Sequence, residues 1–258
     1  MVSRQVVYYK DELTDDFSDN SKIKTKKIDK NYKYIHKNIF WNLCSFVLYR
    51  IIMTPYAYLY MKLKFGLKFV NRQAIKDFKH KGFFVYSNHT QEIGDAFIPT
   101  LLNFPKKTYV VVHPNNISIP FWGNIIKFLG PLPLPGDIGA GKNFVSSIER
   151  LINNKNVITI YPEAHVWNYY TKIRNYSKDS FKYPAKFNAP VFIATTTYQK
   201  RKKKIPQIVV YIDGPFIAPN GLNINEKSIW LRNKALNIMN ERALNSNIQY
   251  IEYVKVSS

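Results

Sequence analysis

The stretch YSNHTQEIGDAF, residues 86–97, brings a histidine and two carboxylates together directly after an apolar run. Imidazole is the side chain whose ordinary pKa lies closest to neutral pH, so His89 is suited to taking a proton from a hydroxyl group. A carboxylate on the other ring nitrogen, here Asp95, would fix the tautomer and stabilise the imidazolium. The same stretch is also compatible with a helix start capped by Asn88, His89 or Thr90, with Asp95 in the first turn.

A second polar cluster, YPEAH at residues 161–165, follows the apolar run NVITI. Proline cannot donate a ladder hydrogen bond, so Pro162 ends the strand and holds Glu163 at its exit. On its own this is a common transition from strand to loop. Lys172 and Arg174 follow shortly and supply positive charge that could hold a phosphate or another anion.

Apolar runs of strand length alternate with segments of helical length from residue 81 onward. The predicted strands are residues 82–88, 108–112, 156–162, 189–198 and 206–214, with a possible edge strand at 248–256. The predicted helices lie near residues 93–103, 120–129, 141–153, 178–187 and 225–245. This alternation indicates an α/β fold with a mostly parallel central sheet flanked by helices. Ligands of such sheets bind outside the carboxyl ends of strands, where both polar clusters fall.

The chain divides into three predicted parts. Residues 1–37, acidic and then basic, form a polar, poorly structured tail, and residues 38–75 form amphipathic, aromatic-rich helices. Residues 76–258 form the α/β domain. The run from Ile39 to Met61 is long enough to span a bilayer. However, a central Arg50 would cost about 2.5–3.5 kcal/mol there, and Pro55 would kink or end a helix.

A helix pair lying in the membrane interface is therefore the favoured reading of Ile39–Met61, with a spanning helix and ordinary core helices as alternatives. The formal net charge of +21, carried mostly by lysine, calls for an anionic partner, and anionic membrane lipids fit this region. We expect a peripheral or monotopic membrane protein on the cytoplasmic face. With Cys44 as the single cysteine and no H-E-x-x-H spacing among the histidines, neither a disulfide nor a metal site is expected.

The clusters resemble the motif blocks of the glycerol-phosphate and lysophosphatidate acyltransferase superfamily, in that family's order, over about residues 80–215. The family's first block is Asn-His, four residues, then Asp. Here five residues separate His89 from Asp95, which leaves Glu92 as the other candidate carboxylate. The third block reads Phe-Pro-Glu-Gly-Thr-Arg in the family and YPEAHVW here, which keeps Pro162 and Glu163 but lacks the glycine and the arginine.

The remaining two blocks are also present in modified form. The second, a glycine and prolines ahead of an arginine, resembles LGPLPLPGD at residues 129–137, without its arginine. The fourth is an apolar strand entered through a proline, here APVFIATT with Pro190.

The resemblance implies transfer of an acyl group in one step. His89, oriented by Asp95, would deprotonate a hydroxyl of a lysophospholipid or glycerol-phosphate-like acceptor, which would attack the thioester of acyl-CoA or acyl carrier protein. No cofactor beyond this co-substrate is implied. The acceptor site would involve Asn88 and Glu163. His165, Lys172 and Arg174 could replace the family's missing arginines, unless the acceptor is not lysophosphatidate.

Two other classes of function have some support in the sequence. GDIGAGKN, residues 136–143, matches the start of a phosphate-binding loop, and VVYID ends in an aspartate, Asp213, that could hold magnesium. Against a nucleotide hydrolase, Asn143 stands where a magnesium-binding hydroxyl is needed, and prolines precede the loop. The simpler reading is a glycine-rich turn that opens a helix at Lys142.

The run QKRKKK, residues 199–204, and the total charge would suit a nucleic-acid-binding protein. No helix-turn-helix, zinc-finger or RNA-recognition signature accompanies them. Because the run lies between two predicted strands, we expect a solvated hairpin tip or a contact for acidic head groups, and no nucleic-acid partner.

Overall fold

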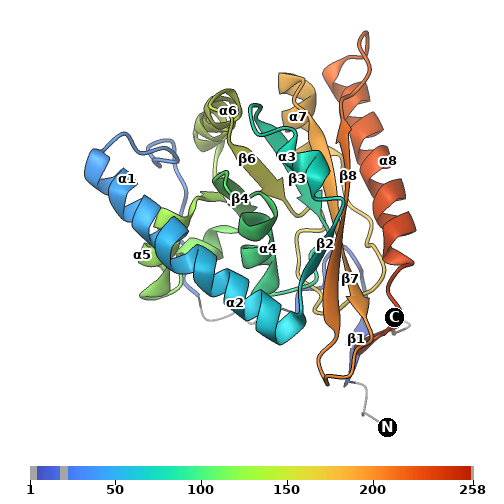
Figure 1. Cartoon of the computed structure of the whole chain (residues 1–258). Coiled ribbons are helices and arrows are strands. Elements are labelled where there is room, and N and C mark those ends of the chain that lie inside the picture. Colours follow the sequence, from blue (N-terminus) through green and yellow to red (C-terminus); the bar gives the residue numbers. More distant parts are fainter. Residues whose placement is uncertain (1–4, 18–22, 257–258) are drawn as a thin grey trace.

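Seven strands form one sheet at the centre of the protein in the computed structural model, which describes residues 5–17 and 23–256 (Figure 1). Their order is β2-β8-β7-β3-β6-β4-β5, and only β7 and β8 pair antiparallel. The strands are β2 (Lys68–Val70), β3 (Phe83–Ser87), β4 (Thr108–Val112), β5 (Pro131–Pro133), β6 (Val157–Ile160), β7 (Val191–Gln199) and β8 (Gln207–Phe216). The predicted α/β fold with a mostly parallel sheet is confirmed.

Helices cover both faces of the sheet because alternate residues of each strand point to opposite sides. Phe84 and Tyr86 of β3 pack with α6 (Ile138–Asn153), α7 (Lys182–Phe187) and α8 (Ile224–Ala243). Phe83 and Val85 pack on the other face with α2 (Thr54–Phe65), α3 (Gln73–Lys76) and α4 (Gly94–Leu102). Both core layers therefore meet at β3, whose residues are all buried.

Two edge strands, β2 and β5, were not predicted, since each contains only three residues. Pro131 and Pro133 are disfavoured in a central parallel strand because proline has no N–H to donate. β5 lies at the edge of the sheet, where a missing N–H is tolerated. The basic run at residues 199–204 lies at the turn of the β7–β8 hairpin, as expected.

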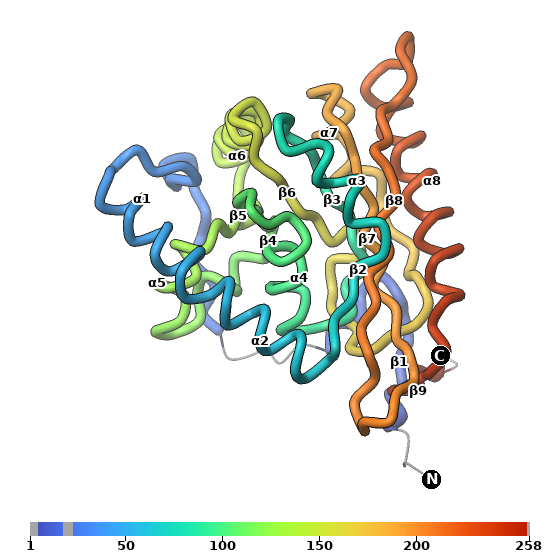
Figure 2. The backbone as a smooth tube through the Cα atoms, viewed as in Figure 1, coloured from blue at the N-terminus to red at the C-terminus, as the bar shows by residue number. Residues whose placement is uncertain are grey.

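The aromatic-rich segment forms one continuous rod of helix, not the expected pair (Figures 1 and 2). It consists of α1 (Ile39–Phe46), a π-helical stretch (Val47–Met53) and α2. The wider π turns end just before Pro55, where the backbone N–H and the hydroxyl of Thr54 both bond to the carbonyl of Tyr49. The missing N–H of Pro55 is thus accommodated without ending the rod.

The rod packs on α4 through α2 and leaves many large apolar side chains exposed along its length. The exposed residues are Ile39, Phe40, Leu43, Phe46, Ile51, Ile52, Tyr56, Tyr58, Leu59 and Leu63. Arg50 is turned back onto the protein, where it bonds to the carbonyl of Pro105 and lies over the ring of Phe104. No helix in the described part of the chain has both the length and the apolar character needed to cross a bilayer.

The expectation of a poorly structured tail over residues 1–37 is wrong for the described parts of that range. β1 (Gln5–Tyr9) pairs in parallel with β9 (Ile251–Lys255), so the closing strand belongs to a separate two-stranded sheet. Ile28 and Tyr34, 1% and 6% exposed, join the core beside α6. Their burial outweighs the polar character of the lysine-rich sequence around them. Residues 1–4 and 18–22 lie outside the described residues.

We expect Ile28→Ala to lower the free energy of unfolding by about 2–5 kcal/mol, because it leaves a cavity in the core. Ile138→Ala is the matched control, since Ile138 is 84% exposed, and it should change stability by less than about 0.5 kcal/mol. Urea denaturation of both variants checks this. Equal effects would contradict the packing of the N-terminal segment.

Candidate active site

The site is built where β3 ends. Asn88, 1% exposed, donates its side-chain N–H to the carbonyl of Thr196 (3.0 Å) and accepts the N–H of Thr196 (2.8 Å), which ties the end of β3 to β7. Ser87 donates its hydroxyl to the carbonyl of Ala194 (2.5 Å). Asn88 was predicted to bind substrate, but its amide is used in this pairing. Its position makes it a positioning residue for the histidine that follows.

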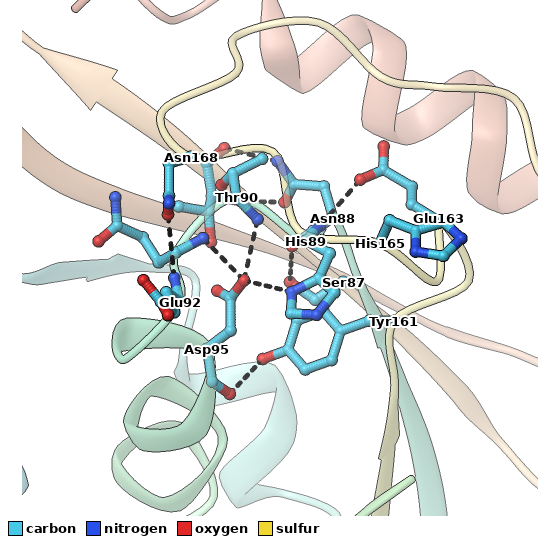
Figure 3. Close-up of polar contacts among 12 residues, drawn as sticks. Ser87, Asn88, His89, Thr90, Glu92, Asp95, Tyr161, Glu163, His165 and Asn168 are labelled. Carbon is cyan, nitrogen blue, oxygen red and sulfur yellow. Dashed lines mark hydrogen bonds and ion pairs between the residues drawn. The ribbon is translucent and has the colours of Figure 1, made fainter. Parts of the chain in front are cut away.

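His89 and Asp95 meet as predicted (Figure 3). The His89 Nδ1 atom lies 2.7 Å from Oδ2 of Asp95, which also accepts the N–H groups of Thr90 and Gln91, each at 2.9 Å. Because a carboxylate only accepts hydrogen bonds, Nδ1 carries the proton of the neutral ring and Nε2 keeps a lone pair. The His89 side chain is 22% exposed and that of Asp95 is 2% exposed. The arrangement is therefore an accessible base on a buried, fixed carboxylate.

The extra residue of the first block is accommodated at the start of α4. This helix begins at Gly94, where a Cβ atom would lie only 2.8 Å from the Cβ of Gln91. The absence of a side chain at Gly94 thus permits the close approach to Gln91 at the start of α4, which places Asp95 beside the imidazole. Glu92, the other candidate carboxylate, is exposed, and its backbone N–H bonds to Asn168 at 3.2 Å. No side chain of residues 88–90 caps α4, so that part of the helix-start alternative is wrong, whereas Asp95 does lie in the first turn.

Tyr161, which sequence reasoning passed over, fixes the plane of the imidazole. Its ring stacks on His89 with centroids 4.6 Å apart and planes at 26° (Figure 3). Its hydroxyl donates to the backbone carbonyl of Asp95 at 2.6 Å, and burial raises the pKa of the phenol well above its usual range. The signal available in the sequence was an aromatic residue directly before Pro162, at the exit of the strand that neighbours β3.

The buried carboxylate of Glu163 bonds to both loops of the site, the one that carries His89 and the one that carries Arg174. One carboxylate oxygen accepts the N–H of His89 (2.9 Å), and the other accepts the N–H of Arg174 (2.9 Å). The guanidinium of Arg174 lies 3.3 Å away, and both side chains are 0% exposed. Burial raises the pKa of the Glu163 carboxyl, while the charge of Arg174 opposes that shift. Glu163 therefore positions the backbone of His89 and does not face an acceptor.

The predicted role of Arg174 in holding a substrate anion is corrected by its surroundings. Besides Glu163, the guanidinium bonds to the carbonyls of His165 and Glu12 and lies over the ring of Trp167. A charge this deeply buried requires such partners, which leaves it no path to a substrate phosphate. Lys172 is exposed, and His165 is one-third exposed with its Nδ1 atom 3.3 Å from Asp16. These two residues remain candidates for contact with an anion.

The loop that carries Glu163 is covered by the N-terminal segment. Trp167, 0% exposed, donates its indole N–H to the carbonyl of Asp15 (3.0 Å) and contacts the rings of Tyr9 and Phe17. The backbone of the same loop runs along the His89 loop, since the N–H of Trp167 bonds to the carbonyl of His89 at 3.1 Å. Residues far apart in the sequence thus hold the histidine in place.

The features that suggested a nucleotide hydrolase have other roles. Residues 138–143 are already within α6, which is capped by the side chain of Asp137 accepting the N–H of Ala140 (2.8 Å). Gly139 and Gly141 therefore belong to the helix, and the N–H of Gly136 bonds to the carbonyl of Ile28 at 3.0 Å, so these glycines do not form a phosphate-binding loop. Asp213 pairs with the guanidinium of Arg242 through both oxygens, at 2.6 and 2.9 Å. Among the described residues, no group of three histidines, cysteines or carboxylates is placed to hold a metal ion.

The chain belongs to the acyltransferase family, because the family model described as Acyltransferase matches residues 66–199, just over half of the chain. A search of curated proteins found no match. Among solved structures, the fold is similar to the 1-acyl-sn-glycerophosphate (LPA) acyltransferase PlsC from Thermotoga maritima, with a TM-score of 0.52 and 14% identity. That match covers 82% of this chain and 98% of the other.

We expect Arg174→Met to lower the free energy of unfolding by about 3–5 kcal/mol, because it leaves the Glu163 carboxylate buried without its partner. The control is Lys182→Met, which breaks an ion pair to Asp179 whose side chains are 51% and 68% exposed. It should change stability by less than about 1 kcal/mol. Chemical denaturation measures both. A raised KM at unchanged stability in Arg174→Met would instead point to contact with a substrate anion.

Proposed function

We propose that the protein is a membrane-associated O-acyltransferase that moves a fatty acyl group from acyl-CoA or acyl carrier protein to a hydroxyl of a lysophospholipid or glycerol-phosphate-like acceptor. The observation that carries the proposal is the contact between His89 and Asp95 at the carboxyl end of β3, in a chain of the acyltransferase family. It requires no cofactor besides the thioester co-substrate.

His89 acts as the general base of a single transfer. Its Nε2 atom takes the proton of the acceptor hydroxyl while that oxygen attacks the thioester carbonyl. Asp95 stabilises the imidazolium that forms, as the orienting carboxylate of a catalytic triad does. The tetrahedral intermediate then expels the thiolate, which takes the proton back from His89. An ester and a free thiol result, and no acyl-enzyme is formed.

The acceptor carries an anionic group in this proposal. Support comes from the structural neighbour, a 1-acyl-sn-glycerophosphate (LPA) acyltransferase, and from the net charge of +21. With Arg174 buried, the residues left to contact the anion are Lys172, which is exposed, and His165. Both follow Glu163 in the loop whose backbone bonds to that of His89.

The membrane association rests on the exposed apolar side of the rod formed by α1, the π stretch and α2. Ile39, Phe40 and Leu43 are 80%, 78% and 57% exposed, and the row continues to Leu63. Exposed apolar side chains in this number along one helical segment of a basic protein fit a helix lying in the interface of an anionic membrane, here its cytoplasmic face. The rod contacts α4, whose first turn carries Asp95, so the reacting centre lies close to the lipid.

We expect His89→Ala to reduce acyl transfer by at least about 100-fold, because no other group replaces the base. The assay follows a labelled acyl group from acyl-CoA onto lysophosphatidate and glycerol 3-phosphate. His80→Ala, an exposed histidine away from the site, should keep wild-type activity, and thermal unfolding should confirm that both variants are folded. Retained turnover in folded His89→Ala would refute the mechanism.

We expect the double variant Phe40→Ser/Leu43→Ser to weaken binding to phosphatidylcholine vesicles at least about ten-fold, since each side chain loses about 1.5–3 kcal/mol of burial. Sedimentation with vesicles measures the binding. Leu244→Ser, also on an exposed leucine (85%), is the control and lies just after α8. Equal loss in both, or no loss in either, would argue against insertion of the rod.

A further inference from the structure

A cavity of about 270 Å³ lies under α1, at the opposite ends of the parallel strands from His89. Its walls include Lys107, which directly precedes β4, and Gly130, which directly precedes β5. These are the amino ends of parallel strands, whereas His89 and Glu163 follow the carboxyl ends of β3 and β6. The cavity is therefore separate from the reacting centre.

The cavity concentrates positive charge. Lys33, Lys107 and Lys127 line it, and no aspartate or glutamate does so among the described residues. Burial and the charge of Arg50 lower the pKa of Lys107 to about 8, which reflects a cation held without an anionic partner. Its ammonium donates only to neutral oxygens, the hydroxyl of Ser45 (2.6 Å) and the carbonyl of Phe128 (3.5 Å). Such a group would be stabilised by an anion with several oxygens.

The roof of the cavity is the inner side of a helix whose outer side is apolar. Trp41 and Ser45 of α1 line the cavity, and the indole ring of Trp41 stacks between His36 (3.8 Å) and Phe128 (4.1 Å). Phe40 and Leu43 of the same helix are exposed. An anion in the cavity would thus lie about one helix diameter, roughly 10 Å, behind an apolar surface.

A second apolar surface borders the same region. Phe121 and Trp122, at the start of α5 (Trp122–Ile126), are 90% and 64% exposed. The 3-10 turn that follows α5 carries Lys127 and contacts α1, and Figure 1 draws α1 and α5 at the same end of the molecule. Lys127 therefore lies in a turn that joins the exposed apolar residues of α5 to α1, a pattern suited to the headgroup layer of a membrane.

We propose that this cavity binds the phosphate of an anionic phospholipid headgroup, as an attachment site distinct from the reacting centre. The inference rests on the proposed membrane association and adds a specific anion site to it. Lys33, Lys107 and Lys127 contact the phosphate oxygens, while α1 lies in the acyl region beside them. The bound lipid holds the rod flat against the membrane, while the reacting centre lies at the carboxyl ends of β3 and β6.

The test compares two double variants that each remove two positive charges. Lys33→Gln/Lys127→Gln removes two lysines that line the cavity. The control, Lys37→Gln/Lys62→Gln, removes one exposed lysine just before the rod and one within it, neither of which lines the cavity. Binding is measured by sedimentation with vesicles of phosphatidylcholine alone and with about 20 mol% phosphatidylglycerol, a lipid that is not the expected product. Thermal unfolding establishes that each variant is folded, and Lys107→Met serves as a third, more deeply placed change.

The expected result is a loss of affinity for phosphatidylglycerol vesicles of roughly five-fold for each cavity lysine removed, with a clearly smaller loss in the control. Binding to pure phosphatidylcholine should stay unchanged in both variants, which separates this site from insertion of the rod. Equal losses in the two variants, or no preference of the wild type for phosphatidylglycerol, would overturn the proposal. Binding of inorganic phosphate is measured by calorimetry in parallel. If phosphate binds tightly, the cavity variant loses that binding, and the wild type shows no preference for phosphatidylglycerol, the cavity is assigned to a soluble anion instead.

Discussion

The carboxylate of Glu163 accepts the backbone N–H of His89 through one oxygen and that of Arg174 through the other, in a position closed to solvent. A buried carboxylate without partners would be severely destabilising, so the loops that supply these N–H groups and the guanidinium must close around it. The loop from Tyr161 to Arg174 is in turn covered by Trp167 and the N-terminal segment. Much of the molecule thus serves to hold one stretch of backbone, and with it the histidine, at the end of β3.

Around that backbone, the imidazole is held from two further directions. Asp95 fixes the hydrogen-bonded side of the ring, and Tyr161 fixes its plane. Asp95 is available because α4 begins at Gly94, where a larger residue would collide with Gln91. The side of His89 that bears Nε2 is the part left for a substrate. A general base for a hydroxyl needs a ring held in one orientation and one nitrogen left free to accept the proton, which is the arrangement of His89.

The parts of this arrangement that could be predicted are those with a local signal. Continuous apolar runs such as residues 82–88 and 156–162 identified the parallel strands, and their exits located His89 and Asp95. The burial of Arg174 could not be predicted in the same way, because nothing in the local sequence distinguishes a buried arginine from an exposed one that binds an anion. The N-terminal segment was missed for a related reason: Ile28 is an isolated apolar residue among lysines, and only long-range packing reveals its place in the core.

The central claim is that Asp95 holds His89 in the form whose Nε2 nitrogen is free to accept a proton. Nitrogen-15 NMR of the histidine side chains, assigned with His89→Ala, reports directly which ring nitrogen bears hydrogen. At a pH where the ring is neutral, we expect the protonated signal at Nδ1 and the unprotonated signal at Nε2 in the wild type, with this preference lost in Asp95→Asn. A ring protonated at Nε2 in the wild type would contradict the assignment of His89 as the base.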